Sequence, residues 1–188
     1  NSKKILFCAA STHPTEEVFC TKVYKELLKK FNKGIIIIIP RHINRSLDIK
    51  NELEQMNFIV HQHTSQRRIK KDTNIYLVDS YGETETFLKL AKVVFMGGSL
   101  IIHGGQNPLE AARLGCKILH GTNILNFKEV YNLLKKNNIS EKITSVRKAK
   151  KIIIKLLKNK SNKNIEKKLK IIGNQILNKN EKEIQKYF

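Results

Sequence analysis

The sequence predicts an α/β protein in which a mainly parallel sheet is flanked by helices. Short apolar runs alternate with amphipathic stretches up to residue 127, a pattern typical of successive βα units. Turn-forming residues such as Pro14, Pro40 and Gly97 follow several of these runs. With 188 residues, 40% of them hydrophobic, the chain is long enough for one α/β domain with a core of ordinary size.

Six apolar runs have the length of strands, and amphipathic helices are expected between most of them. The first helix is expected to begin at Glu16, after Thr15 as its cap, and to stop before Gly34. The run at 35–39 is apolar throughout, which predicts a strand that is buried on both faces. The expected strands cover residues 5–10, 35–39, 58–60, 75–78, 93–96 and 117–119. Further helices are expected at 47–56, 82–90 and 107–115, and the chain beyond 127 is expected to be mostly helical.

We expect one domain over residues 1–145, followed by Lys-rich helices at 146–188 that pack on the same domain. Isoleucine and leucine recur at roughly helical spacing in this C-terminal region. The formal net charge of +20 has two explanations that stay open. Acidic partners such as phosphates, anionic lipid or nucleic acid would favour it, and so would a composition that is rich in Lys, Ile and Asn throughout.

Several classes of protein are disfavoured by the composition. No run of about 18 uncharged apolar residues occurs, so no membrane-spanning helix is expected. Cys8, Cys20 and Cys116 are scattered, which argues against a disulfide framework or a zinc site and suits a reducing compartment. The chain begins with Asn1 and carries no secretory signal, so we expect a fragment, a processed product or a remnant of a longer protein.

Unusual residues gather where several predicted strands end. In an open α/β sheet, ligands bind just beyond the carboxyl ends of the strands. We therefore predict one crevice that is formed by loops from separate strands. The residues expected at or near it are His13 after the first strand, Pro40 and Arg41 after the second, Tyr81, Gly82 and Glu83 after the fourth, Gly97, Gly98 and Ser99 after the fifth, and Asn107, Pro108, Leu109 and Glu110 at the next helix.

The segment at 97–112 is the most informative part of this crevice. Its glycines let a ligand approach the backbone closely, and Pro108 at a first helical turn loses no hydrogen bond. The free N–H groups at the helix start favour a phosphate, and Glu110 could accept bonds from vicinal ribose hydroxyls. The alternative is a tight connection in which Glu110 only complements the helix dipole. The dinucleotide pattern GxGxxG after the first strand is absent.

The remaining polar residues carry weaker signals. Arg41 suits a bidentate phosphate contact or, alternatively, a solvated surface position, and His13 is either a crevice residue or a turn histidine. His61 and His63 have no partner at metal-ligand spacing, so we expect surface residues and no metal site. The Lys-rich helices lack interleaved aromatic residues, which makes nucleic acid an unlikely partner.

Seven short stretches, taken together, resemble the 3-deoxy-D-manno-octulosonic acid (Kdo) transferases. These enzymes move Kdo from CMP-Kdo to a lipid A precursor. The order and spacing of the stretches hold from the first strand to about residue 130. They are AASTHP at 9–14, EE at 16–17, PRH at 40–42, VDSYGE at 78–83, FMGGSL at 95–100, GGQNPLE at 104–110 and NFKE at 126–129.

The resemblance implies a Rossmann-like domain that forms the C-terminal half of a GT-B glycosyltransferase and holds the CMP part of the donor. It implies inverting transfer without a metal or another cofactor, and a phosphate beside Arg41 and Asn107 would stabilise the departing CMP. Three departures from the family pattern are Tyr81 for methionine, Gln106 for histidine, and residues 43–45 for Pro-Glu-Arg. The CMP contacts that the resemblance implies are at Pro40, Arg41, Tyr81, Gly82, Glu83, Asn107, Pro108, Leu109 and Glu110.

In that family an N-terminal half provides the membrane anchor, the acceptor site and the catalytic glutamate. We expect no catalytic residue in this chain and no activity from it alone. The expected setting is the cytoplasmic face of the bacterial inner membrane, where the basic residues at 148–186 would meet anionic lipid or reflect composition only. The alternatives are a GT-B transferase or epimerase that uses a UDP-sugar, and a non-catalytic module that binds membrane or nucleic acid.

Overall fold

A computed structural model describes residues 4–158, 169 and 185 of the chain. In this part, seven parallel strands form one sheet with the order β3-β4-β2-β1-β5-β6-β7. The strands are β1 (Lys4–Thr12), β2 (Lys33–Pro40), β3 (Val60–Gln62), β4 (Ile75–Leu77), β5 (Val93–Met96), β6 (Lys117–His120) and β7 (Ser140–Lys142). The predicted parallel α/β fold is therefore confirmed.

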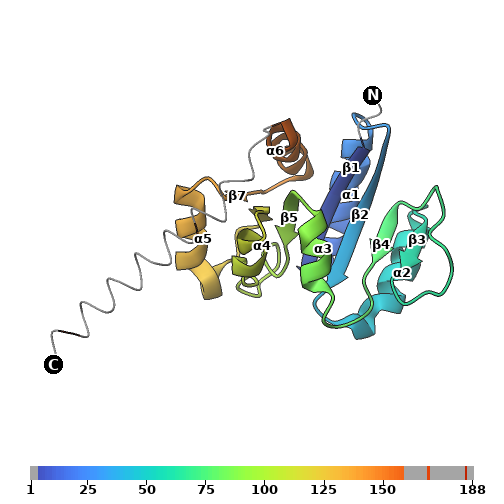
Figure 1. The fold of residues 1–188 in the computed structure, drawn as a ribbon, viewed down its shortest axis with the longest axis horizontal. Coiled ribbons are helices and arrows are strands. Elements are labelled where there is room, and N and C mark those ends of the chain that lie inside the picture. Colours follow the sequence, from blue (N-terminus) through green and yellow to red (C-terminus); the bar gives the residue numbers. More distant parts are fainter. Residues whose placement is uncertain (1–3, 159–168, 170–184, 186–188) are drawn as a thin grey trace.

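Helices cover both faces of the sheet (Figure 1). They are α1 (Glu16–Leu28), α2 (Ser46–Gln55), α3 (Thr84–Leu90), α4 (Leu109–Arg113), α5 (Lys128–Lys136) and α6 (Val146–Lys158), with 3₁₀ turns at Ile43–Arg45 and Leu125–Phe127. The core on one face contains side chains of α1, α2 and α6, and the core on the other contains side chains of α3, α4 and α5. Successive residues of β2 alternate between these two cores, which explains why its isoleucine run is apolar throughout.

The order of the strands reverses next to β1. Strands β2, β4 and β3 follow on one side of β1, and β5, β6 and β7 follow on the other. The helices that follow β1 and β5 therefore lie on opposite faces of the sheet, and ligands bind at such a point in open α/β sheets. The residues predicted to form the crevice follow strands that end at this edge, and the crevice itself stays a prediction.

Some elements differ from the prediction. The strand expected at 58–60 lies at Val60–Gln62, and the helix expected from 107 begins at Leu109 and has five residues. Strand β7 lies where only helix was expected. Its residues Ser140, Glu141 and Lys142 are polar, and they form a strand because the backbone at the edge of β6 offers free hydrogen-bonding groups.

Two further expectations concern the C-terminal region. Helix α6 packs on α1, and its Ile153 lies in the core on that face. Most of the expected region at 146–188 and of the basic segment at 148–186 lies outside the described residues. Among the helices that the structure describes, none is long and apolar enough to cross a membrane.

Candidate functional site

The loops after β1, β2 and β5 are bonded to one another at the carboxyl edge of the sheet. The amide of Arg41 donates a hydrogen bond to the carbonyl oxygen of Thr12 at 2.9 Å. The amide of Gly97 donates one to the carbonyl oxygen of Ala10, also at 2.9 Å. A Cβ atom at Gly97 would lie 2.1 Å from the carbonyl oxygen of Ser11. Glycine is therefore required at 97 so that the β5 loop can lie directly on the β1 loop.

His13 lies at the centre of this junction and is only 5% exposed. Its ring centroid is 4.2 Å from that of His103 and 5.9 Å from that of His42. Its Nε2 is 3.1 Å from Nε2 of Gln106. Histidines from three separate loops thus meet at one point, so His13 is packed among the loops at the carboxyl edge of the sheet.

The surroundings of His13 favour its neutral form. Burial lowers its pKa to about 4, and the nearby charges of His103, His42, Arg45 and Arg41 act in the same direction. Since the side-chain nitrogen of Gln106 is a donor, Nε2 of His13 accepts that bond and Nδ1 carries the proton. His13 can therefore accept or donate a hydrogen bond at neutral pH without adding a charge.

Glu16 connects the β1 and β5 loops. Its buried carboxylate accepts four backbone N–H bonds, from His13 at 3.0 Å, Gly98 at 2.7 Å, Ser99 at 3.0 Å and Leu100 at 2.9 Å. The amides of the glycine-rich loop thus face an internal anion. Gly97, Gly98 and Ser99, which were expected to line the crevice, are buried.

Glu17 performs the same task for the β2 loop. It accepts bonds from the Thr12 hydroxyl at 2.9 Å and from the Arg45 guanidinium at 3.0 and 3.4 Å. Burial raises the pKa of Glu17, and its bond to Arg45 opposes that rise. Sequence reasoning missed these roles because acidic residues are common at the start of a helix. The only signal in the sequence was that both residues lie on the same face of the helix as its apolar residues.

The exposed part of the site consists of Arg41 and the loop after β4. Arg41 is exposed, and in the described part of the chain no carboxylate is paired with it. Tyr81 is 71% exposed, and Gly82 has φ of 84° with open space around it. Buried beside them, the hydroxyl of Ser80 has no hydrogen-bond partner. This loop can therefore receive a ligand without displacing existing contacts.

The segment from Gln106 to Glu110 leads from the loop after β5 into α4. The carbonyl of Gln106 accepts a bond from the Tyr131 hydroxyl at 2.9 Å, and Oδ1 of Asn107 accepts the amide of Leu109 at 3.0 Å. Pro108 is buried, whereas Asn107 and Glu110 are exposed. Because α4 has only five residues, its dipole contributes less toward a phosphate than the sequence suggested. Arg41, directly after β2, places an exposed positive charge at this edge of the sheet.

His61 and His63 are half-buried rather than on the surface. His61 stacks on Tyr76 with 5.4 Å between ring centroids, and Nδ1 of His63 lies 2.8 Å from the Tyr76 hydroxyl. They pack there because β3 pairs with β4 in the sheet, with His61 opposite Tyr76 in the register. Among the described residues no cluster of His, Cys, Asp or Glu has the arrangement of a metal site.

The sequence is similar to known transferases over about two thirds of its length. No protein-family model matches it. The 3-deoxy-D-manno-octulosonic acid transferase of Haemophilus influenzae is 30% identical over 129 residues, which are 69% of this chain and 30% of that protein. The enzyme of the same name from Rickettsia bellii is 36% identical over 126 residues. The chain thus spans about a third of the length of these relatives.

Solved structures agree with this similarity. The C-terminal CMP-Kdo binding domain of WaaA from Acinetobacter baumannii is 28% identical, with a TM-score of 0.73 over 82% of this chain and 79% of that domain. A glycotransferase of kitacinnamycin, 10% identical with a TM-score of 0.54, shares the fold alone. The predicted Rossmann-like fold is confirmed by these likenesses.

Proposed function

Because the chain belongs with the Kdo transferases, as a counterpart of their C-terminal domain, we propose that it binds the donor CMP-Kdo. The likeness to the domain of Acinetobacter baumannii carries this proposal, since that domain is named for CMP-Kdo binding. Transfer of Kdo would be an activity of the whole protein, of which this chain would provide the donor-binding wall.

We place the CMP across the mouth of the β1/β5 crevice. Arg41 is exposed and unpaired within the described residues, so its guanidinium is free to bind the phosphate in a bidentate way. Glu110 on the opposite rim is exposed and can accept bonds from the two ribose hydroxyls. The open backbone at Gly82, between Tyr81 and Glu83, leaves room for the base or the sugar.

In the transfer itself, an acceptor oxygen would form a bond to the anomeric carbon of Kdo and give up its proton to a base of the whole protein, while the bond between that carbon and the phosphate oxygen breaks. Its electron pair goes to that oxygen, and the departing CMP gains a negative charge. Arg41 would stabilise this charge in a position that the β1 loop fixes through the bond from the Arg41 amide to Thr12. His13, which its burial keeps neutral, would form a hydrogen bond to a polar group of CMP-Kdo and so orient it. We assign no general base to this chain.

The acceptor and the location belong to the same proposal. From the resemblance to the Kdo transferases we propose a lipid A precursor as the acceptor, and with it a role in lipopolysaccharide biosynthesis. Work on such a lipid would take place at the cytoplasmic face of the inner membrane, where a chain of net charge +20 would be attracted to anionic lipid.

Calorimetry with CMP, UMP and UDP tests the donor class directly. We expect CMP to bind at least about fivefold more tightly than UMP or UDP, and Arg41→Gln to weaken CMP binding about tenfold. Arg147→Gln, which removes an exposed arginine of α6, is the matched control and should leave the affinity unchanged. Equal or tighter binding of UDP would instead favour a domain that uses a UDP-sugar.

A further inference from the structure

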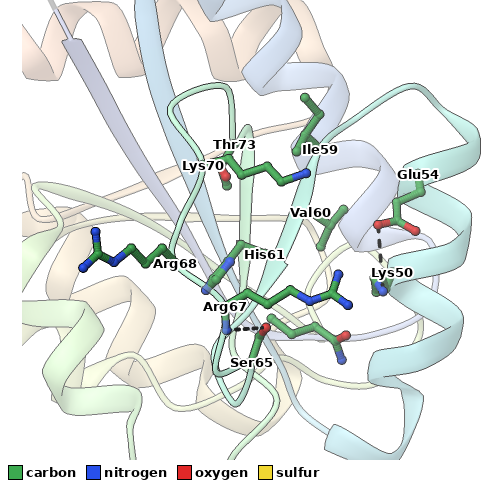
Figure 2. A pocket seen from close by; sticks show the side chains of 11 residues that line it. Lys50, Glu54, Ile59, Val60, His61, Ser65, Arg67, Arg68, Lys70 and Thr73 are labelled. Atoms are coloured by element: carbon green, nitrogen blue, oxygen red, sulfur yellow. Dashed lines mark hydrogen bonds and ion pairs between the residues drawn. The ribbon is translucent and has the colours of Figure 1, made fainter.

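A second polar cavity lies at the outer edge of the sheet, away from the crevice. It has a volume of about 360 Å³ and lies between α2, the edge strand β3 and the loop at 63–74 (Figure 2). Strands β2 and β4 stand between β3 and β1. At about 4.8 Å per strand spacing, this places β3 about 14 Å from β1. The loop after β4 lies closer, but none of the residues that line the cavity is among those proposed to contact CMP.

Basic side chains dominate the lining of this cavity. Lys50, Arg67, Arg68 and Lys70 line it together with a single carboxylate, that of Glu54. Glu54 is 4.0 Å from the ammonium group of Lys50, at the outer limit of an ion pair. Throughout the described residues, no carboxylate is paired with the two arginines or with Lys70. The cavity therefore carries an excess of positive charge, which Glu54 compensates only in part.

The orientation of these side chains brings several donors together. Arg67 and Lys70 extend toward the side of the cavity where Lys50 and Ile59 lie, whereas Arg68 extends the other way (Figure 2). The Ser65 hydroxyl accepts a bond from the Arg67 amide at 3.3 Å and keeps its own proton to donate. Like charges held this close repel one another, and an anion in the cavity would offset that repulsion.

We propose that this cavity binds a phosphorylated ligand that carries at least two negative charges. Guanidinium and ammonium groups bind phosphate oxygens strongly, and a guanidinium can do so through two parallel bonds. A volume of about 360 Å³ exceeds that of a single phosphate and falls in the range of small-molecule sites. The phosphate could belong to a soluble compound or to a lipid headgroup, and Ile69, which is exposed between Arg68 and Lys70, would suit the lipid.

Chemical shifts of backbone amides provide a test that separates this cavity from the CMP site. Pyrophosphate is titrated into the ¹⁵N-labelled chain in the presence of saturating CMP. We expect shifts at residues 61–73 and unchanged signals around Arg41 and Glu110. The double variant Arg67→Gln/Lys70→Gln should bind pyrophosphate at least about tenfold more weakly, since it loses two charge-assisted contacts.

Lys71→Gln is the matched control, because Lys71 is exposed beside Lys70 but does not line the cavity. It should change the affinity by less than about twofold, as expected of a surface charge under ionic screening. A second arm measures co-sedimentation with vesicles of phosphatidylcholine that contain phosphatidic acid, and with vesicles of phosphatidylcholine alone. Binding only to the vesicles with phosphatidic acid, lost in the double variant, would identify a lipid phosphate as the source.

Three results would overturn the proposal. The first is that pyrophosphate leaves the amide signals of residues 61–73 unchanged and the chain does not co-sediment with vesicles that contain phosphatidic acid. The second is that the double variant binds both probes as the wild type does. The third is that Lys71→Gln weakens binding as much as the double variant, which would mean that only the general positive charge matters.

Discussion

Glu16 and Glu17 stand side by side at the start of α1, yet their carboxylates belong to different networks. Glu16 is bonded to backbone amides of the β1 and β5 loops, and Glu17 to Thr12 and Arg45. A buried carboxylate is tolerated only where hydrogen bonds or an opposite charge replace its hydration. These two residues therefore fix the relative positions of the three loops that carry His13, Arg41 and the glycine-rich turn.

Replacing Glu16 by Gln should destabilise the fold strongly. Each carboxylate oxygen of Glu16 accepts two amides, and the NH₂ group of glutamine would oppose two of them. We expect a loss of about 3 kcal/mol in the free energy of unfolding, because charge-assisted bonds are lost and buried donors remain unsatisfied. Urea denaturation measures this loss. Glu85→Gln, which removes an exposed carboxylate of α3, should cost less than about 0.5 kcal/mol; a similar loss in both variants would contradict the role of Glu16.

Glu110 should determine the response to the ribose of the nucleotide. We expect Glu110→Ala to weaken CMP binding about tenfold, because two hydrogen bonds to a charged acceptor are lost. If Glu110 binds the 2′-hydroxyl, dCMP should bind the wild type as weakly as CMP binds the variant. Calorimetry with both nucleotides measures this, and Glu85→Ala serves as the control. Equal affinities for CMP and dCMP in both proteins would remove Glu110 from the site.

His120 gives the fold a specific dependence on pH. It is 3% exposed, its Nδ1 lies 2.7 Å from the carbonyl of Gly121, and its ring packs on Tyr131. Burial lowers its pKa to about 4 from an ordinary value of 6.5. Above pH 6.5 the histidine is neutral in both states. As the pH falls from 6.5 to 4, the unfolded chain binds a proton that the folded chain does not, so stability is lost over this range.

His120→Asn tests this, because its amide nitrogen can replace Nδ1 toward Gly121 but does not titrate. We expect wild type to lose up to about 3 kcal/mol more than the variant between pH 6.5 and 4. Urea denaturation at several pH values gives the difference. Burial raises the pKa of Glu17, so Glu17 changes the stability in the opposite direction as the pH falls. Because Glu17 is present in both proteins, its contribution cancels when the variant is subtracted from the wild type. Parallel curves for the two proteins would contradict the assignment to His120.

At the scale of elements, α6 is part of the core although its sequence is rich in lysine. Ile153 is 1% exposed and lies in the core beside α1, and Lys150 is bonded to Glu26 of α1 at 2.9 Å. Ile153→Ala should lower the free energy of unfolding by about 2–4 kcal/mol, because a cavity is left at the α1–α6 contact. Lys151→Ala, on the exposed side of α6, should change it by less than about 0.5 kcal/mol in the same urea titration. Equal small effects would mean that α6 is dispensable.

For the whole molecule, the charge of +20 predicts binding to anionic membranes that depends on salt. Within α6, Lys150 is bonded to Glu26, which leaves Lys148 and Lys151 exposed for such a contact. We expect the chain to co-sediment with anionic vesicles at low salt and to be released as salt rises. Lys148→Gln/Lys151→Gln should weaken this binding, and Lys22→Gln/Lys25→Gln on α1 is a control with the same charge change. Equal binding to neutral vesicles would show that the charge reflects composition only.

Much of the site was predictable because it depends on short segments with strict local requirements. The residues after β1, β2, β4 and β5 could be placed at one edge from the alternation of strands and helices alone. Other features depended on distant partners. Glu16 accepts hydrogen bonds from the amides of Gly98, Ser99 and Leu100, which lie more than 80 residues away in the chain. No local sequence pattern indicates these bonds.

The sequence by itself determined the parallel α/β fold, the strands of the core and the loops that follow them, because hydrophobic periodicity and turn residues act over a few neighbouring positions. The tertiary structure alone decided which carboxylates hold the loops, that β7 completes the sheet, and that His13, His42 and His103 meet. The physical reason is that hydrogen bonds and burial depend on the partners that folding brings together, and the net stabilisation of a polar group depends on those partners rather than on its own identity.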